Sequence, residues 1–298
     1  MSALARRDGP APADTEEMAP PGEGAWTGDP EEAYAEGERM REASRPEEAE
    51  AWYRRAAEAG HAGAANSLAL LLDERGAKQA AEVWYRLAAE MGSVDAAYNL
   101  GLLLEERGEA GSAKEWYLRA AEAGDPEAAY HLGVLLEERE EREAAEGWYR
   151  RAGAAGHGAA ANSLGLLLDE RGHAAEAQTW YTRAAEAGDL DGAYNLALVL
   201  QRRGAYEEAE RWYRLAAGSG DAESAYALGV LLEARGQQDE AERWYGRAAE
   251  AGHVDSAYYL GLKHEERGAA AEAEGWYRRA AAGGHLAARR KLATPPTV

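Results

Sequence analysis

The chain has 298 residues, no cysteine, nine tryptophans and sixteen tyrosines, and its formal net charge is −21 at pH 7. The lack of cysteine excludes disulfides, a thiolate nucleophile and cysteine-ligated zinc. The acidity argues against binding to nucleic acid, which needs a positive footprint on the protein.

Residues 1–28 are rich in Pro, Gly and acidic residues and lack the apolar segment of a secretory signal, so they predict a disordered leader. No run of 18 apolar residues occurs, and the sequence therefore predicts no membrane helix. The absence of cysteine fits a reducing cytoplasm, and the abundance of Ala, Gly, Glu and Arg is typical of a GC-rich bacterial genome. We expect a cytoplasmic protein.

From Asp29 onward the chain repeats itself every 32 residues. The pair Trp-Tyr occurs eight times at this spacing, from Trp52 to Trp276. A fixed period of this length indicates a stack of similar supersecondary units. The eight blocks are 29–60, 61–92, 93–124, 125–156, 157–188, 189–220, 221–252 and 253–284.

Each block predicts two short antiparallel helices. In the block 93–124, an apolar stripe through Leu100 predicts a first helix that ends at Gly108, and a second stripe through Trp116 and Tyr117 predicts a second helix. An aromatic cage or a base-stacking platform is the alternative for the Trp-Tyr pair, but its spacing favours burial. We expect the tyrosine between the two helices and the tryptophan against the neighbouring repeat.

A small residue recurs in the middle of each first helix. A glycine at that place costs helix stability, so its repeated use predicts that the partner helix presses against bare backbone there. The residues are Gly37, Ala69, Gly101, Gly133, Gly165, Ala197, Gly229 and Gly261.

The sequence contains no recognisable catalytic constellation. Four histidines open a block or the final segment, namely His61, His157, His253 and His285, and this favours a role at a helix start over metal binding. No phosphate loop, dinucleotide-binding glycine motif, nucleophile elbow or complete zinc-protease motif is present. We therefore predict no enzyme activity, no cofactor and no metal site.

Pairs of acidic residues recur near the end of the first helix. We expect a solvated face on which they pair with local arginines, and the alternative is an acidic track for a basic partner. The pairs are Asp73-Glu74, Glu105-Glu106, Glu137-Glu138, Asp169-Glu170 and Glu265-Glu266.

The run WYRRAAEAGHAGAANSLALLLDERG resembles the Sel1-like repeat, a relative of the tetratricopeptide repeat. The resemblance covers about residues 29–290, although the turn between the helices is shorter than Sel1-like repeats commonly have. It implies an all-α fold, a right-handed α-solenoid of eight helix-turn-helix repeats whose first helices line a concave groove. The amphipathic segment 285–293 predicts a C-terminal capping helix, and 294–298 a disordered tail.

The resemblance also implies which residues line the groove. Tyrosine supplies amphipathic contact area and asparagine can pair with a peptide backbone. Packing of the tyrosines between adjacent first helices is an equal alternative. The candidates are Asn66, Tyr98, Asn99, Tyr130, His131, Asn162, Tyr194, Asn195, Tyr226 and Tyr258.

A slower period lies beneath the repeat. The segments 61–76 and 157–172, three blocks apart, differ at only three positions, so a site built from one three-repeat cassette is expected twice. The sequence thus predicts a scaffold that binds a protein or peptide partner, with no nucleic acid or membrane partner. The alternative is a sensor of peptides or small ligands that changes solenoid curvature to control a partner.

Overall fold

The structure is a computed structural model that describes residues 28–293, and every regular element in this range is an α-helix. The predicted tail and all of the predicted leader except Gly28 lie outside the described residues. The helices are α1 Pro30–Glu42, α2 Pro46–Glu58, α3 Ala62–Glu74, α4 Lys78–Glu90, α5 Val94–Glu106, α6 Ala110–Glu122, α7 Pro126–Glu138, α8 Arg142–Ala154, α9 Gly158–Glu170, α10 Ala174–Glu186, α11 Leu190–Arg202, α12 Tyr206–Gly218, α13 Ala222–Ala234, α14 Gln238–Glu250, α15 Val254–Glu266, α16 Ala270–Ala282 and α17 Leu286–Ala293.

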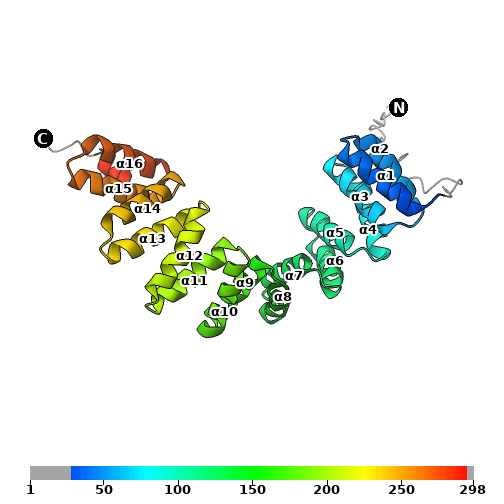
Figure 1. Cartoon of the computed structure of the whole chain (residues 1–298), viewed down its shortest axis with the longest axis horizontal. Helices are drawn as coiled ribbons and strands as arrows, with labels where there is room; N and C mark the ends of the chain where they lie inside the picture. The colour runs from blue at the N-terminus through cyan, green and yellow to red at the C-terminus, as the bar shows by residue number, and fades with distance from the viewer. Residues whose placement is uncertain (1–27, 294–298) are drawn as a thin grey trace, which may run out of the picture. The chain divides into compact units, whose positions relative to one another are not determined.

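The helices follow the predicted blocks, two to a block, and the predicted capping helix is present as α17. The chain divides into two compact units, Met1–Ala128 and Ala129–Val298. Within the two units, helices adjacent in the chain pack on one another, for example α3 on α4 and α4 on α5 in the first and α9 on α10 in the second, as Figure 1 shows. Each unit is a series of helix pairs, which confirms the predicted α-solenoid architecture.

The helix ends form for the reasons that the sequence suggested. Gly108 and Gly124, which end the two helices of one repeat, have φ angles of 77° and 106°. Only glycine adopts this left-handed conformation without steric cost, and the turn it makes satisfies the last carbonyls of the helix. Glu140, between α7 and α8, takes the same conformation without being glycine.

The helix starts are capped by side chains. The imidazole Nδ1 of His61 accepts a hydrogen bond from the Ala64 amide at 2.9 Å, and His157, His253 and His285 do the same for their helices. Ser93 and Asp189 take this role in other repeats. The structural interpretation of the four histidines is therefore confirmed.

The tyrosine of the Trp-Tyr pair forms the core of each repeat. All eight of these tyrosines are buried, and the mid-helix glycine lies directly against the ring in its own repeat. A Cβ atom on Gly101 would lie 2.5 Å from Cε1 of Tyr117, which is closer than two carbon atoms can pack. The prediction that a partner group presses on bare backbone is confirmed.

The tryptophan of the pair is less uniform than predicted. Trp116 and Trp180 are buried, each with 7% of its surface exposed, whereas the other six are half-buried. Trp180 lies against Gly153 of the preceding repeat, where an added Cβ would come within 3.1 Å of the indole. The tryptophan thus packs against the neighbouring repeat, but it is fully covered in only two places.

Candidate partner-binding surface

The ten candidate groove residues all lie on the first helices of their repeats, and we call them the first-helix row. Asn66, Tyr98 and Asn99 belong to the first unit and the other seven to the second. Nine are half-buried, and Asn162 is buried with 9% of its surface exposed. Most of the row is therefore only partly exposed, and its role as a partner-binding groove stays a prediction.

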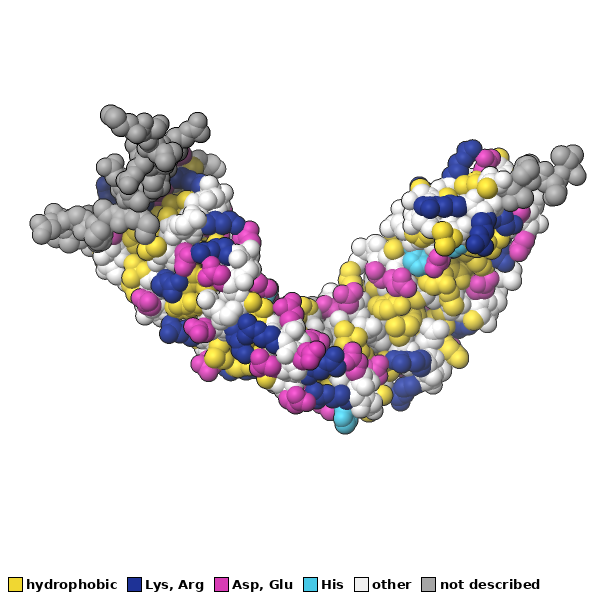
Figure 2. Space-filling model, turned by 180° about the vertical axis from the view of Figure 1, so that it is seen from behind, with side chains coloured by type: hydrophobic (Ala, Val, Ile, Leu, Met, Phe, Trp, Pro, Cys, Tyr) yellow, Lys and Arg dark blue, Asp and Glu magenta, His cyan; other side chains and the backbone are white. Residues whose placement is uncertain are grey.

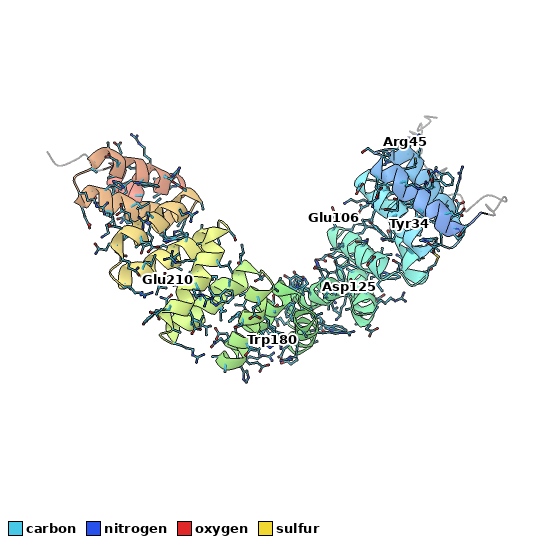
Figure 3. All side chains as sticks on the ribbon, in the orientation of Figure 1. Tyr34, Arg45, Glu106, Asp125, Trp180 and Glu210 are labelled. Atoms are coloured by element: carbon cyan, nitrogen blue, oxygen red, sulfur yellow. The ribbon has the colours of Figure 1, made fainter. Side chains whose placement is uncertain are left out.

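Each tyrosine of the row packs on the core tyrosine of its own repeat. The ring centroids of Tyr98 and Tyr117 lie 6.0 Å apart, and those of Tyr226 and Tyr245 lie 5.8 Å apart. Tyr34, labelled on α1 in Figure 3, occupies the equivalent place in the first repeat and packs on Tyr53. These contacts hold one face of each ring while the side chain stays half-exposed.

A capping histidine from the next repeat covers several of these rings. Tyr130 stacks on His157 with 4.7 Å between ring centroids, and Tyr258 stacks on His285 at 4.1 Å. Tyr226 makes the same contact with His253 at 4.4 Å. The opening histidines thus have a second role, since they help to orient the tyrosines of the row.

Tyr98 and Tyr194 have aspartate at that place instead of histidine. Burial raises the pKa of Tyr98, and the nearby carboxylates of Glu127 and Asp125 raise it further. Burial likewise raises the pKa of Tyr194, with a further contribution from Glu223 and Asp221. Both phenols therefore remain neutral hydrogen-bonding groups at ordinary pH.

Asparagines link first helices of successive repeats at two places. The Asn99 amide nitrogen donates to the Asn66 carbonyl oxygen at 3.1 Å, and Asn195 donates to Asn162 at 2.9 Å. The two pairs are equivalent positions three repeats apart, one in each unit. This duplication matches the cassette seen in the sequence.

His131 belongs to the row and contacts the tyrosine that precedes it in the chain. Its ring meets the ring of Tyr130 edge-on, with 5.7 Å between the centroids. The residue follows Tyr130 directly on α7, where other repeats carry Asn99 or Asn195. The structure thus brings Tyr130, His131 and His157 together as one aromatic group.

The acidic pairs meet the expectation of arginine partners only in part: Asp169 pairs with Arg202 at 3.3 Å and Glu170 with Arg142 at 3.2 Å. Where the first acid of a pair is glutamate, it accepts a hydrogen bond from the core tyrosine hydroxyl, as Glu105 does from Tyr117 at 2.5 Å and Glu137 from Tyr149 at 2.8 Å. The second acid is exposed, and Glu106 pairs with Lys78 rather than with an arginine. A constant spacing of 12 residues between acid and tyrosine was the signal that sequence reasoning missed.

A network of arginine, glutamate and tryptophan on the second helices was also missed. Arg214 of α12 forms ion pairs with Glu210 and Glu240, both at 2.7 Å, and its guanidinium carbon lies 5.9 Å from the ring centroid of Trp244. Arg235, which belongs to the next repeat, also pairs with Glu210, at 2.6 Å. We call this arrangement the second-helix network; Figure 3 labels Glu210.

Charges of both signs are interspersed on the face drawn in Figure 2, and no large patch of one sign is visible there. Within residues 28–293, no three His, Asp or Glu side chains gather as metal ligands would. Every helix in the same range is too short or too polar to cross a bilayer.

This architecture is that of an α-solenoid built from helical pairs, and the sequence comparisons identify the family. The Sel1 repeat family matches residues 27–61, 75–93, 94–125, 126–157, 174–189, 222–253 and 254–285, so the chain belongs to it. A tetratricopeptide repeat family matches residues 191–217. No curated protein sequence matches the chain.

Two solved structures are similar over nearly the whole chain. One is c5321, a protective antigen of uropathogenic Escherichia coli with the SLR fold, at 26% identity and a TM-score of 0.76 over 89% of this chain. The chain spans 64% of the length of that protein. The other is a Sel1 repeat protein from Oxalobacter formigenes, at 25% identity and a TM-score of 0.69, covering 90% of this chain and 86% of that one.

Proposed function

We propose that the chain is a non-enzymatic scaffold that binds a protein or peptide segment over its first helices. Repeats of this family are typical of proteins that present extended surfaces to other proteins. The observation that carries the proposal is the pair of asparagine contacts, Asn66–Asn99 and Asn162–Asn195, each beside a half-buried tyrosine. The cytoplasmic location remains a prediction from the sequence.

The asparagine pairs suit an extended peptide. A side-chain amide offers two donor hydrogens and an acceptor oxygen with two lone pairs, and one hydrogen bond between two amides leaves several of these groups. A peptide backbone has alternating donors and acceptors of the same kind. Tyr98 and Tyr194, adjacent to Asn99 and Asn195, add apolar contact and a neutral hydroxyl.

The test is capture of partners from the native cell with two variants of the whole chain. The fourfold variant N66A/N99A/N162A/N195A removes both partners of each amide pair, so no amide is left without its mate. The control is Thr179→Ala on the second helix α10, where the hydroxyl bonds only to its own helix backbone.

We expect the wild type and the control to recover a partner in stoichiometric amount and the fourfold variant to lose it, with unchanged helical circular dichroism. Equal recovery by all three proteins would contradict the proposal. A saturable thermal shift with short peptides would instead favour the sensor that the sequence left open.

A further inference from the structure

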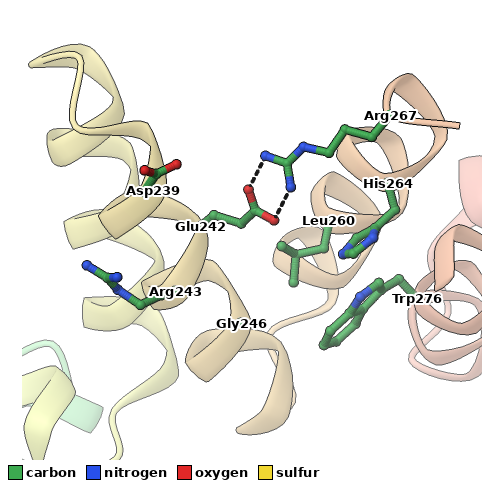
Figure 4. Close-up of a pocket in the computed structure, with 8 residues that line it drawn as sticks. All are labelled: Asp239, Glu242, Arg243, Gly246, Leu260, His264, Arg267 and Trp276. Atoms are coloured by element: carbon green, nitrogen blue, oxygen red, sulfur yellow. Dashed lines mark hydrogen bonds and ion pairs between the residues drawn. The ribbon is translucent and has the colours of Figure 1, made fainter. Parts of the chain in front are cut away.

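A hollow of about 470 Å³ in the second unit interrupts the second-helix network. It lies between α14 and the pair α15–α16 and is lined by Gly246, Leu260, His264 and Trp276 with charged side chains around them. In Figure 4 the indole of Trp276 points toward the helix that carries Gly246. A Cβ atom on Gly246 would have no atom within 4 Å, so the space in front of it is open.

Other repeats place an arginine where Gly246 lies. Arg54, Arg86, Arg150 and Arg214 occupy the equivalent position, two residues after the tryptophan of the repeat. Arg54, Arg86 and Arg214 each hold the guanidinium carbon 5.6 to 5.9 Å from the ring centroid of the next repeat's tryptophan. Gly246 therefore leaves Trp276 without the cation that lies over Trp84, Trp116 and Trp244, and the cation over Trp276 is Arg279 of its own helix, at 5.3 Å.

The acidic partners of the missing arginine are still present. Arg214 is held by Glu210 of its own helix and Glu240 of the next repeat. The residues at the equivalent positions are Glu242, which lines the hollow, and Glu272, which lies four residues before Trp276 on α16. Glu242 is bound by Arg267 alone, and Glu272 forms no ion pair with any described residue.

The charge at the hollow is compatible with an added cation. Its charged lining consists of Asp239, Glu242, Arg243 and Arg267. The same positions one repeat earlier hold Glu207, Glu210, Arg211 and Arg235, with identical charge signs, and Arg214 still fits among them. The preceding repeat thus shows that two acidic residues and two arginines in this arrangement accommodate a further guanidinium, that of Arg214.

Two other repeats lack this arginine, but neither offers the same site. In one, Leu118 stands at the position of Gly246 and Lys114 replaces the glutamate that would hold a guanidinium. In the other, Thr182 stands at the position of Gly246, and Gln178 replaces that glutamate. Arg203 donates to the Gln178 carbonyl oxygen in place of a carboxylate. An arginine entering at Thr182 would therefore lack its principal ion pair, whereas the hollow at Gly246 retains it.

We propose that the hollow at Gly246 binds an arginine side chain of a partner protein, which stacks on Trp276 and pairs with Glu242 and Glu272. A guanidinium is favoured over an ammonium because it is planar, stacks on aromatic rings and forms two parallel hydrogen bonds to a carboxylate. The inference rests on the proposal that the chain binds protein segments, at a surface separate from the first-helix row.

The test uses N-acetyl-arginine amide as the probe and follows the tryptophan indole N–H signals by nuclear magnetic resonance, with Trp276 assigned from the Trp276→Phe variant. We expect a saturable shift of the Trp276 signal with the arginine probe and a weaker response to N-acetyl-lysine amide. N-acetyl-citrulline amide, which has the shape of the arginine probe without its charge, should give no response.

Two glycine-to-arginine variants make the test specific. Gly246→Arg places an arginine side chain on α14 itself, so the arginine probe should no longer shift the Trp276 signal. Gly147→Arg makes the same change on α8, also in open space, and should leave the response intact. A citrulline response equal to that of arginine, a response that survives in Gly246→Arg, or no saturable shift in the wild type would overturn the proposal.

The experiment is independent of the first-helix row. The fourfold asparagine variant should bind the arginine probe as the wild type does, because none of its changes lies at the hollow. If the arginine probe does not bind, the proposed partner binding by the first-helix row is not contradicted. If the fourfold variant still captures the partner, the proposed arginine site is not contradicted.

Discussion

At the scale of single residues, the contact between the mid-helix glycine and the core tyrosine sets how closely the two helices of a repeat approach. Gly133 lies against Tyr149, and an added Cβ would come within 2.5 Å of the ring carbon Cε1. Tyr149 is fully buried and its hydroxyl is held by Glu137, so the ring has little room to move. At Gly133 the close contact with the ring offsets the cost of glycine to the helix, whereas Ala69 and Ala197 occupy the equivalent place in two other repeats.

We predict opposite effects for the same substitution at two glycines of one repeat. Gly133→Ala should lower the free energy of unfolding by about 1–2 kcal/mol, since overpacking outweighs the gain in helix propensity. Gly147→Ala, in the interior of α8 with open space around it, should raise that free energy by about 0.5–1 kcal/mol. Urea denaturation measures both, and stabilisation by Gly133→Ala would show that the tyrosine ring yields easily.

The sequence predicted these glycines and buried tyrosines because each depends on spacing along one helix. It did not predict the tyrosine–glutamate bonds, since these depend on side-chain reach. Glu105 reaches the hydroxyl of Tyr117, whereas Asp73, one methylene shorter, forms no such bond to Tyr85 in the described structure. The half-burial of the first-helix row could not be predicted either, because it results from packing between repeats.

The missing arginine at Gly246 was within reach of the sequence. Aligning the 32-residue blocks shows Arg54, Arg86 and Arg214 at the position of Gly246. The sequence does not show that this arginine contacts the tryptophan of the next repeat. That contact is known only from the structure.

At the scale of helices, an ion pair joins the end of the first helix to the second helix of the preceding repeat in several repeats. Arg171, the residue after α9, pairs with Glu146 of α8, and Arg235 pairs with Glu210 in the same way. Because these pairs are only partly buried, each contributes little by itself. Their repetition adds to the attraction between neighbouring repeats.

We predict that Gln178→Glu stabilises the protein by about 0.5–1 kcal/mol at low salt, because it gives Arg203 the carboxylate that other repeats have. Glu146→Gln, the reverse change one repeat earlier, should destabilise by a similar amount. Both effects should shrink in 1 M salt, where such pairs are screened. Equal effects at low and high salt in urea denaturation would show that charge is not the cause.

At the scale of the whole molecule, eight buried tyrosines make stability sensitive to alkali. Burial raises the pKa of Tyr181 to about 12, with a further contribution from the carboxylate of Asp169. Burial raises the pKa of the other seven core tyrosines as well, from Tyr53 to Tyr277. In the unfolded chain a tyrosine ionises near its ordinary pKa of about 10.

The sign of the effect follows from these values. Above a pH of about 10 the unfolded chain loses protons that the folded protein keeps, so the free energy of unfolding falls as pH rises. Each tyrosine contributes a slope of at most about 1.4 kcal/mol per pH unit, and for Tyr181 the loss is complete near its folded pKa of about 12.

We therefore expect the urea midpoint to be constant near pH 8 and to fall steeply between pH 10 and about 11. Tyr181→Phe keeps the ring and removes the ionising hydroxyl, so its midpoint should fall less steeply over the same range. An identical pH dependence in this variant and the wild type would exclude Tyr181 as a contributor.

The repeated hydrogen bonds also bear on how the chain is made. The tyrosine–glutamate bonds span 12 residues, the arginine–glutamate bonds between repeats span 25, and the asparagine bonds span 33. Proteins whose contacts are this local in sequence fold fast, because little loop-closure entropy is lost before each contact forms. During synthesis, a repeat can complete its contacts once the following repeat has left the ribosome, without waiting for the end of the chain.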